Sequence, residues 1–346
     1  MVNVNITSGA AATEDSANGY NGGLIAASYG SVINAFATGS ITGVGAIVIG
    51  GLIGESIDSS ISNSYADVTI NSPGGSFVGG LLGYDKGGAV IDATDAADSY
   101  ANYVGRFVGA NYGGNISRSY ATGDVTACGN VGVLIGYNIS DSVLNGNIDH
   151  SYATWTVRGN VASSTNLGGL IGENDGGDVS YSYATGDATG GNTIGGLLGS
   201  NGQTHSQRPS GYVTDSYTTG NVTATNGNYG GGLVAGAGGV FIRDYAKGNV
   251  TASGDYAGGL VGDGGEIINS QAYGTMSGRD YVGGAQGFGS FLDGASASGN
   301  VTGRNYVGGL LGKSLGDSYG PVVILNSECD GARRLRRRPG RRECRI

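Results

Sequence analysis

The stretch Gly168-Gly169-Leu170-Ile171-Gly172 carries a phrase, Gly-Gly-Leu-(Ile/Leu/Val)-Gly, that recurs along the whole chain. Successive copies begin 25 to 36 residues apart. A repeat of about 20 to 50 residues indicates a solenoid, a propeller or another repeat array. The copies begin at Gly22, Gly50, Gly79, Gly105, Gly132, Gly168, Gly195, Gly231, Gly258, Gly283 and Gly308.

A second phrase follows each glycine phrase and reads Ser-Tyr-Ala-Thr-Gly-(Asp/Asn)-Val-Thr in its best form. In the copy at 182–189, the small residues Ala184, Gly186 and Ala188 alternate with tyrosine, threonine and aspartate. Alternation with a period of two places the two sets on opposite faces of a β-strand. We assign the small residues to the interior, because the opposite assignment would bury charge.

The glycine phrase does not alternate strictly, so it predicts a strand that bends at a corner. Glycine suits such a corner because it tolerates close backbone approach and positive φ. If the copies stack, their leucines form one column inside the fold. This column would contain Leu24, Leu52, Leu81, Leu134, Leu170, Leu197, Leu233, Leu260 and Leu310.

These patterns together predict an all-β protein, a parallel β-solenoid (β-helix) of about eleven coils with roughly 27 residues per coil. At the usual spacing between strands, about 4.8 Å, eleven coils make a rod roughly 50 Å long. A propeller fits less well, because its blades need about 40 to 50 residues. Within one longer step, Trp155 occupies a position where other coils have glycine, and we expect it to fill a wider part of the core.

Composition excludes several classes of protein. The chain has 346 residues, of which 72 are glycine, but it lacks the three-residue period of collagen. No run of about 18 apolar residues is present, so no membrane span is expected. The net charge is −9, and residues 333–346 hold eight arginines and one glutamate. The preceding body is therefore strongly acidic, which argues against a nucleic-acid partner.

The two linked phrases resemble the GLUG repeat of bacterial surface proteins over about residues 20–328. This resemblance implies an extracellular or cell-surface location and an accessory role, as in large adhesins or beside the catalytic part of immunoglobulin A peptidases. The sequence departs from the pattern at Arg106 and Val133, which replace the second glycine, and at Ala285-Gln286.

The organisation that follows has three parts. Residues 1–20 form an N-terminal lead-in or cap, 21–328 form the repeat solenoid, and 329–346 form an aberrant, disordered arginine-rich tail. The abrupt change of composition inside a repeat suggests a frame change or a truncated fragment of a longer polypeptide. A genuine basic tail that binds anionic surfaces is the alternative.

Residues that resemble catalytic motifs lack the required context. Gly312-Lys313-Ser314 ends like a phosphate-binding loop, but that loop needs a further glycine at Val307 and a following helix. The same stretch resembles a nucleophile elbow, which needs an α/β setting. His150 and His205 are the only histidines. We therefore expect no enzyme activity, cofactor or metal site.

The outward residues of the second phrase form a candidate surface-binding ladder. Threonines four residues apart are expected to lie on one strand face, with an aromatic column beside them. Such an array could order water or bind sugars, whereas the simpler interpretation is a solvated face of good strand formers. The ladder comprises Thr38, Thr42, Tyr120, Thr122, Thr126, Tyr183, Thr185, Thr189, Tyr217, Thr219 and Thr223.

The sequence therefore predicts a non-catalytic stalk or adhesive segment that contacts a host or cell-surface protein or a glycan. An ice- or carbohydrate-binding module is one alternative. A polysaccharide-degrading β-helix enzyme is a weaker one, because the acidic residues recur at equivalent repeat positions rather than converging.

Overall fold

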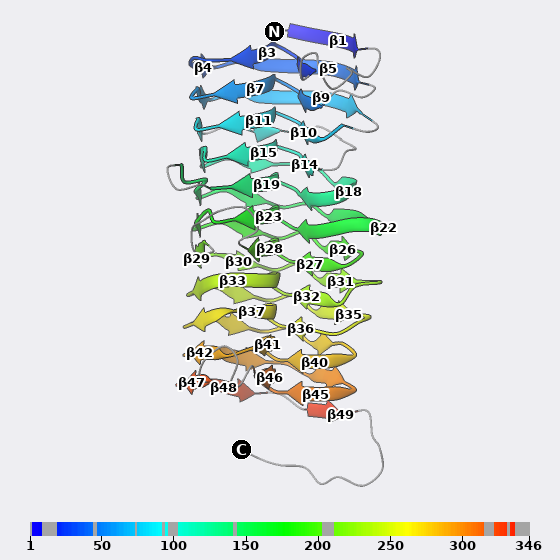
Figure 1. Cartoon of the computed structure of the whole chain (residues 1–346), viewed down its shortest axis with the longest axis vertical. Coiled ribbons are helices and arrows are strands. Elements are labelled where there is room, and N and C mark those ends of the chain that lie inside the picture. The colour runs from blue at the N-terminus through cyan, green and yellow to red at the C-terminus, as the bar shows by residue number, and fades with distance from the viewer. Residues whose placement is uncertain are drawn as a thin grey trace.

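The computed structural model describes residues 2–8, 19–43, 47–72, 75–91, 94–95, 103–140, 144–202, 211–314, 322–330 and 333–335. Within these ranges every regular element is a β-strand. The chain winds into a single stack of coils from one end of the molecule to the other (Figure 1). About 10 turns of about 28 residues each are present, which confirms the predicted parallel β-solenoid.

One coil shows how the phrases build the wall. The glycine phrase turns the chain from β22 (Val157–Gly168) into β23 (Ile171–Asp175), and β24 (Val179–Ser180) follows. The tyrosine phrase then supplies β25 (Tyr183–Ala184) and β26 (Ala188–Gly190), before β27 (Thr193–Gly195) begins the next coil. Each of these strands pairs in parallel with its equivalent in the neighbouring coils, so three sheets run along the stack.

The sheet that carries the tyrosine phrase contains one strand from each coil, in chain order. Its strands are β1 (Val2–Ser8), β5 (Phe36–Gly43), β9 (Tyr65–Asn71), β13 (Thr94–Asp95), β17 (Tyr120–Ala121), β21 (Tyr152–Ala153), β25, β30 (Tyr217–Thr218), β34 (Tyr245–Ala246), β38 (Gln271–Ala272), β43 (Ser296–Ser298) and β48 (Glu328–Asp330). At the far end, β49 (Arg333–Leu335) pairs with β44 (Val301–Gly303). The ladders thus continue into the arginine-rich segment, whose residues 336–346 lie outside the described part.

The glycine phrases stack in register along the whole length. The first glycine of each copy pairs with the first glycine of the next, from Gly22 with Gly50 to Gly283 with Gly308. The two steps of 36 residues keep the same pairing of first glycines, because the register is restored at the next glycine phrase.

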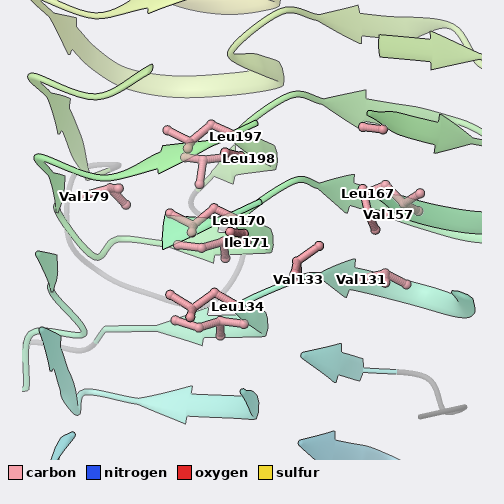
Figure 2. Close-up of a cluster of buried hydrophobic side chains, with 14 of the residues drawn as sticks. Val131, Val133, Leu134, Val157, Leu167, Leu170, Ile171, Val179, Leu197 and Leu198 are labelled. Atoms are coloured by element: carbon pink, nitrogen blue, oxygen red, sulfur yellow. The ribbon is translucent and has the colours of Figure 1, made fainter. Parts of the chain in front are cut away.

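The predicted leucine column forms the interior of the corner. The amide of Leu134 donates to the carbonyl of Leu170, and the amide of Leu170 donates to the carbonyl of Leu197, both at 2.9 Å. Figure 2 shows these three side chains one above another. Phe107 and Ala285 take the leucine position in their coils. Leu24 is 39% exposed because it belongs to the first coil, where β3 (Ile25–Ser28) pairs on one side only among the described strands.

The burial pattern confirms the assigned parity. Ala184 and Ala188 are buried, whereas Tyr183, Thr185 and Asp187 lie on the outside. The divergent copy at 271–277 keeps the same alternation over all seven residues.

The expected role of Trp155 is wrong. Its backbone lies above Gly186, and a methyl group built on Gly186 would lie 1.9 Å from the carbonyl oxygen of Trp155. Neighbouring coils therefore touch through their backbones at this corner, which leaves no inward space for a ring. The indole points outward and the residue is 48% exposed.

The corner glycines give a direct test of the stacking. A Cβ atom on Gly195 would lie 1.8 Å from the carbonyl oxygen of Leu198, which is rigid backbone. We predict that Gly195→Ala destabilises the solenoid by at least about 1–3 kcal/mol, as overpacking in cores does. Gly30→Ala is the matched control, since a Cβ there meets nothing within 4 Å. Thermal melts followed by circular dichroism compare the two variants, and equal melting temperatures would contradict the packing described.

Candidate binding surface

Five tyrosines form a continuous ladder on the sheet of the second phrase. Their strands pair so that each ring lies directly above the next. Ring centroids are 4.7–4.9 Å apart and the interplanar angles are 2–6°. We call this set the tyrosine ladder, and it comprises Tyr120, Tyr152, Tyr183, Tyr217 and Tyr245.

The sequence identified only part of this ladder as a site. Tyr120, Tyr183 and Tyr217 belong to the candidate ladder that the sequence predicts, whereas the structure adds Tyr152 and Tyr245. The sequence signal for Tyr152 is incomplete: the phrase Ser-Tyr-Ala-Thr is present at 151–154, but the glycine that should follow it is absent. Only the ladder register shows that this copy is equivalent to the others.

Ring stacking decides what the tyrosine ladder presents to a partner. Each inner ring uses both faces on its neighbours, so the faces are not free to stack on a sugar or another planar group. Lys247 covers the outer face at one end, with its ammonium 5.1 Å from the centroid of Tyr245. The ladder therefore offers ring edges and a row of phenolic hydroxyls, one per coil.

The predicted threonines lie in two columns that are only partly continuous. Thr122, Thr185 and Thr219 each follow a ladder tyrosine by two residues. Because those tyrosines are in register, the three threonines form a column beside the tyrosine ladder. In the other column Thr189 pairs with Thr223, but Arg158 stands between Thr126 and Thr189. In the first long strands, Asp67 and Asn71 stand opposite Thr38 and Thr42.

The expectation that each threonine pair shares one strand face holds for only one of the four pairs. Thr38 and Thr42 both lie in β5. In the coils of Thr122/Thr126, Thr185/Thr189 and Thr219/Thr223, the chain turns a corner at the intervening glycine, so the tyrosine phrase is divided between two sheets. These six threonines therefore do not form a flat plane.

The Asp and Asn residues beside this corner have a structural role. Asp187 Oδ1 accepts a hydrogen bond from the amide of Asn221 at 2.7 Å, and Asn221 Oδ1 accepts one from the amide of Asn249 at 3.0 Å. Each carboxylate or amide oxygen thus binds a backbone N–H of the next coil, which the turn leaves without a ladder partner.

A second aromatic column, which the repeat phrases do not predict, lies beside the glycine corner. Tyr229, Tyr256, Tyr281 and Tyr306 stack at 4.9 Å, and the last three have φ of 51–57°. Lys313, in β46 (Leu311–Ser314), lies 5.0 Å from the ring centroid of Tyr306. The stretch that resembles a phosphate-binding loop is therefore a strand whose lysine contacts aromatic rings.

His150, the histidine in the described part of the chain, is not part of a metal-binding group. His150 is exposed, and its Nδ1 lies 2.8 Å from Asp149 Oδ2. His205 lies outside the described residues. In the described ranges, no group of three or more His, Cys, Asp or Glu side chains is placed to hold a metal ion. The same part of the chain contains no helix long and apolar enough to cross a membrane.

The tyrosine ladder also has a distinct acid–base behaviour. Burial, and then the charge of neighbouring phenolates, raises the pKa of Tyr152, Tyr183 and Tyr217 above 10.0. Burial raises the pKa of Tyr84 to about 12. A raised pKa favours the neutral folded form, so these groups stabilise the fold below pH 10 and lose that contribution as pH rises further.

We therefore predict that part of the 21 tyrosines ionises above pH 10, together with loss of β-structure. Phenolate absorbance and circular dichroism, recorded in one alkaline titration, check this. Replacing Tyr152, Tyr183 and Tyr217 by phenylalanine should remove a fraction of the late transition. A single transition of all tyrosines near pH 10 would contradict the prediction.

Comparison with known proteins identifies the repeat. The family model described as "The GLUG motif" matches residues 45–71, 100–126 and 163–189. Each matched segment contains one glycine phrase and the tyrosine-phrase strand that follows it. No solved structure matches the chain.

A curated relative is Halomucin from Haloquadratum walsbyi (strain DSM 16790 / HBSQ001), which is 34% identical over 193 residues. The match covers 49% of this chain and 2% of the relative, so the chain spans a small fraction of that protein. The motif matches and the stacked phrases agree on the same repeat unit: three segments of the chain match the GLUG motif, and each lies within the coils of the parallel β-solenoid.

Proposed function

We propose that this solenoid is a non-catalytic segment of a secreted or cell-surface protein, which acts as a stiff stalk with an adhesive lateral face. The tyrosine ladder carries this proposal. It repeats the same hydroxyl and the same ring edge at each coil, whereas an enzyme needs different groups at one place. Repeated weak contacts along a rigid rod add up to strong attachment through multivalency.

The comparisons support the location rather than the partner. The GLUG motif and the similarity to a segment of Halomucin favour a surface repeat protein. The small share of Halomucin that is matched favours a chain that belongs to a longer polypeptide. The partner that we propose is a cell-surface protein or a glycan, because the acidic body would repel nucleic acid.

A glycan would meet the ladder in a specific way. Because the ring faces are occupied by neighbouring rings, a sugar chain would contact the phenolic hydroxyls and ring edges. A polymer along the rod axis would encounter one hydroxyl every 4.7–4.9 Å if the hydroxyls follow the rings. A glycan would therefore bind to the same tyrosine ladder as a protein partner. Ice binding is less favoured, because the threonine pairs are split around a corner.

The test replaces Tyr152, Tyr183 and Tyr217 together by phenylalanine, which keeps the stacked rings and removes three hydroxyls. Binding to a glycan array and to immobilised cell-surface proteins is compared with the unaltered solenoid. Since three hydrogen bonds of about 0.5–1.5 kcal/mol each would be lost, we expect binding to be roughly tenfold to thousandfold weaker. Tyr212→Phe, an exposed residue outside the ladder, is the matched control and should bind normally.

Two results would contradict the proposal. Equal binding of the triple variant would show that the ladder is not the adhesive face. Release of reducing ends from polygalacturonate would show that the solenoid is catalytic. Thermal hysteresis of the solution, lost in Thr189→Ala and Thr223→Ala variants, would favour the ice-binding alternative instead.

A further inference from the structure

A column of buried polar side chains runs through the interior beside the leucine column. Its members pair in register on successive coils, and each is 0% exposed. We call it the asparagine column, and it comprises Ser56, Asp85, Asn111, Asn138, Asn174 and Asn201.

The asparagines are joined by a repeated hydrogen-bond pattern. Asn111 Nδ2 donates to Asn138 Oδ1 at 2.7 Å, Asn138 Nδ2 donates to Asn174 Oδ1 at 2.6 Å, and Asn174 Nδ2 donates to Asn201 Oδ1 at 2.7 Å. Each Nδ2 also donates to a carbonyl of the following loop, such as that of Gly114. Every amide oxygen in this series therefore depends on a donor from the preceding coil.

The pattern fails where the preceding coil carries aspartate. Asn111 Oδ1 has no donor, and both carboxyl oxygens of Asp85 are buried without a hydrogen-bond partner. A methyl group built on Gly114 would lie 2.0 Å from Asp85 Oδ2 and 2.5 Å from Asn111 Oδ1, so the two oxygens border one small space. A carboxylate can only accept, whereas a carboxylic acid has the missing O–H donor.

The same substitution occurs in a second buried column, which is made of serines. Ser216 and Ser270 each donate the hydroxyl to the carbonyl two residues earlier, at 2.9 Å. Each hydroxyl oxygen also accepts a hydrogen bond from a backbone amide of the preceding coil. Asp244 replaces the serine between them and is 1% exposed. Its Oδ1 accepts the amide of Ser216 at 2.8 Å, but its Oδ2 has no partner.

We propose that Asp85 and Asp244 are held as neutral carboxylic acids that complete these two columns, which makes the solenoid a proton-dependent structure that loosens at both places as the pH rises. In each column the acid supplies a donor where the neighbouring coils use an amide or a hydroxyl. Two independent sites show the same unpaired oxygen, so the feature is not confined to one coil.

The electrostatic surroundings agree with this assignment. Burial raises the pKa of Asp85 to about 7, and the charge of Asp58 adds to the increase, while the nearby Ser56 hydroxyl and Lys86 backbone amide oppose it. Glu55, Tyr84, Lys86 and Tyr112 are the other titratable groups on the strand of Asp85 and the two strands paired with it. Burial also raises the pKa of Asp244 well above 3.8. Asp215 adds to this, whereas Arg243 and backbone amides oppose it, and Tyr217, Tyr245 and Lys247 lie on or beside the adjoining strands.

The direction of the pH effect follows from these shifts. The folded pKa of Asp85 lies above its ordinary value of 3.8, so its contribution to stability is complete below about pH 4. That contribution is lost as pH rises toward about 7 and changes little beyond it. Since each pKa unit is a factor of ten, the local opening equilibrium should rise by up to about a thousandfold across this range.

Hydrogen exchange on the whole chain tests the proposal, with protection factors corrected for intrinsic exchange at pH 4 and pH 8. In the unaltered protein, protection should fall with pH in two regions. The first comprises β7 (Ile53–Ile57), β11 (Leu82–Lys86) and β15 (Val108–Tyr112), and the second comprises β30, β34 and β38. Asp85→Asn should abolish the pH effect in the first region only, and Asp244→Ser in the second only, because each restores the residue type that the column uses elsewhere.

Asp67→Asn, an exposed substitution in β9, is the matched control and should leave both pH effects unchanged. Isotope-edited infrared spectra of the unaltered protein provide a readout that does not depend on folding of a variant. They should show two carboxylic acids still protonated at pH 5. Absence of that band, or an equal pH effect in Asp85→Asn and the unaltered protein, would overturn the proposal. So would restored protection at pH 8 on adding Na⁺ or Ca²⁺, since the oxygens would then hold a cation rather than a proton.

Discussion

The structure depends on the parallel hydrogen-bonded register between consecutive coils. Backbone amides at the glycine corner donate to carbonyls one coil further on, and those of Leu134, Leu170 and Leu197 reach the carbonyl of the equivalent residue. Parallel pairing at a common rise places identical positions above one another. Because the register does not slip at the glycine phrases, any residue type that repeats in the sequence becomes a column in space. The corner glycines enforce this, since a side chain at Gly195 would overlap the backbone.

Stacked columns let polar side chains inside the solenoid find hydrogen-bond partners. The interior of the coils contains polar side chains as well as apolar ones. Asparagine fits there because its side chain carries both a donor and an acceptor, so each copy can bond to the copy in the next coil. Serine fits because its hydroxyl donates to a backbone carbonyl and accepts a backbone amide. Aspartate carries such a donor only when it is protonated, and at two positions buried carboxyl oxygens have no donor to accept from.

Repetition also determines the outer surface. Tyrosines at one position form a stack whose faces are covered and whose edges are exposed, so the ladder presents hydroxyls and not planes. The Asp and Asn residues at the next corner are engaged with backbone amides, as Asp187 is with Asn221. A surface of this kind is suited to many equivalent contacts along the rod. It differs from a site in which different groups meet at one place.

The period, the inward parity of Ala184 and Ala188, and the stacking of the glycine phrases could all be predicted from the sequence. This is because these features repeat and follow from strand geometry and glycine sterics alone. Only the tertiary structure decided where the chain turns within the tyrosine phrase, and therefore that Thr185 and Thr189 lie on different sheets and that Trp155 points outward. It also decided that the tyrosine rings cover one another and that Asp85 stands in a column of asparagines. These outcomes depend on contacts between coils that are distant in sequence, and no single repeat contains that information.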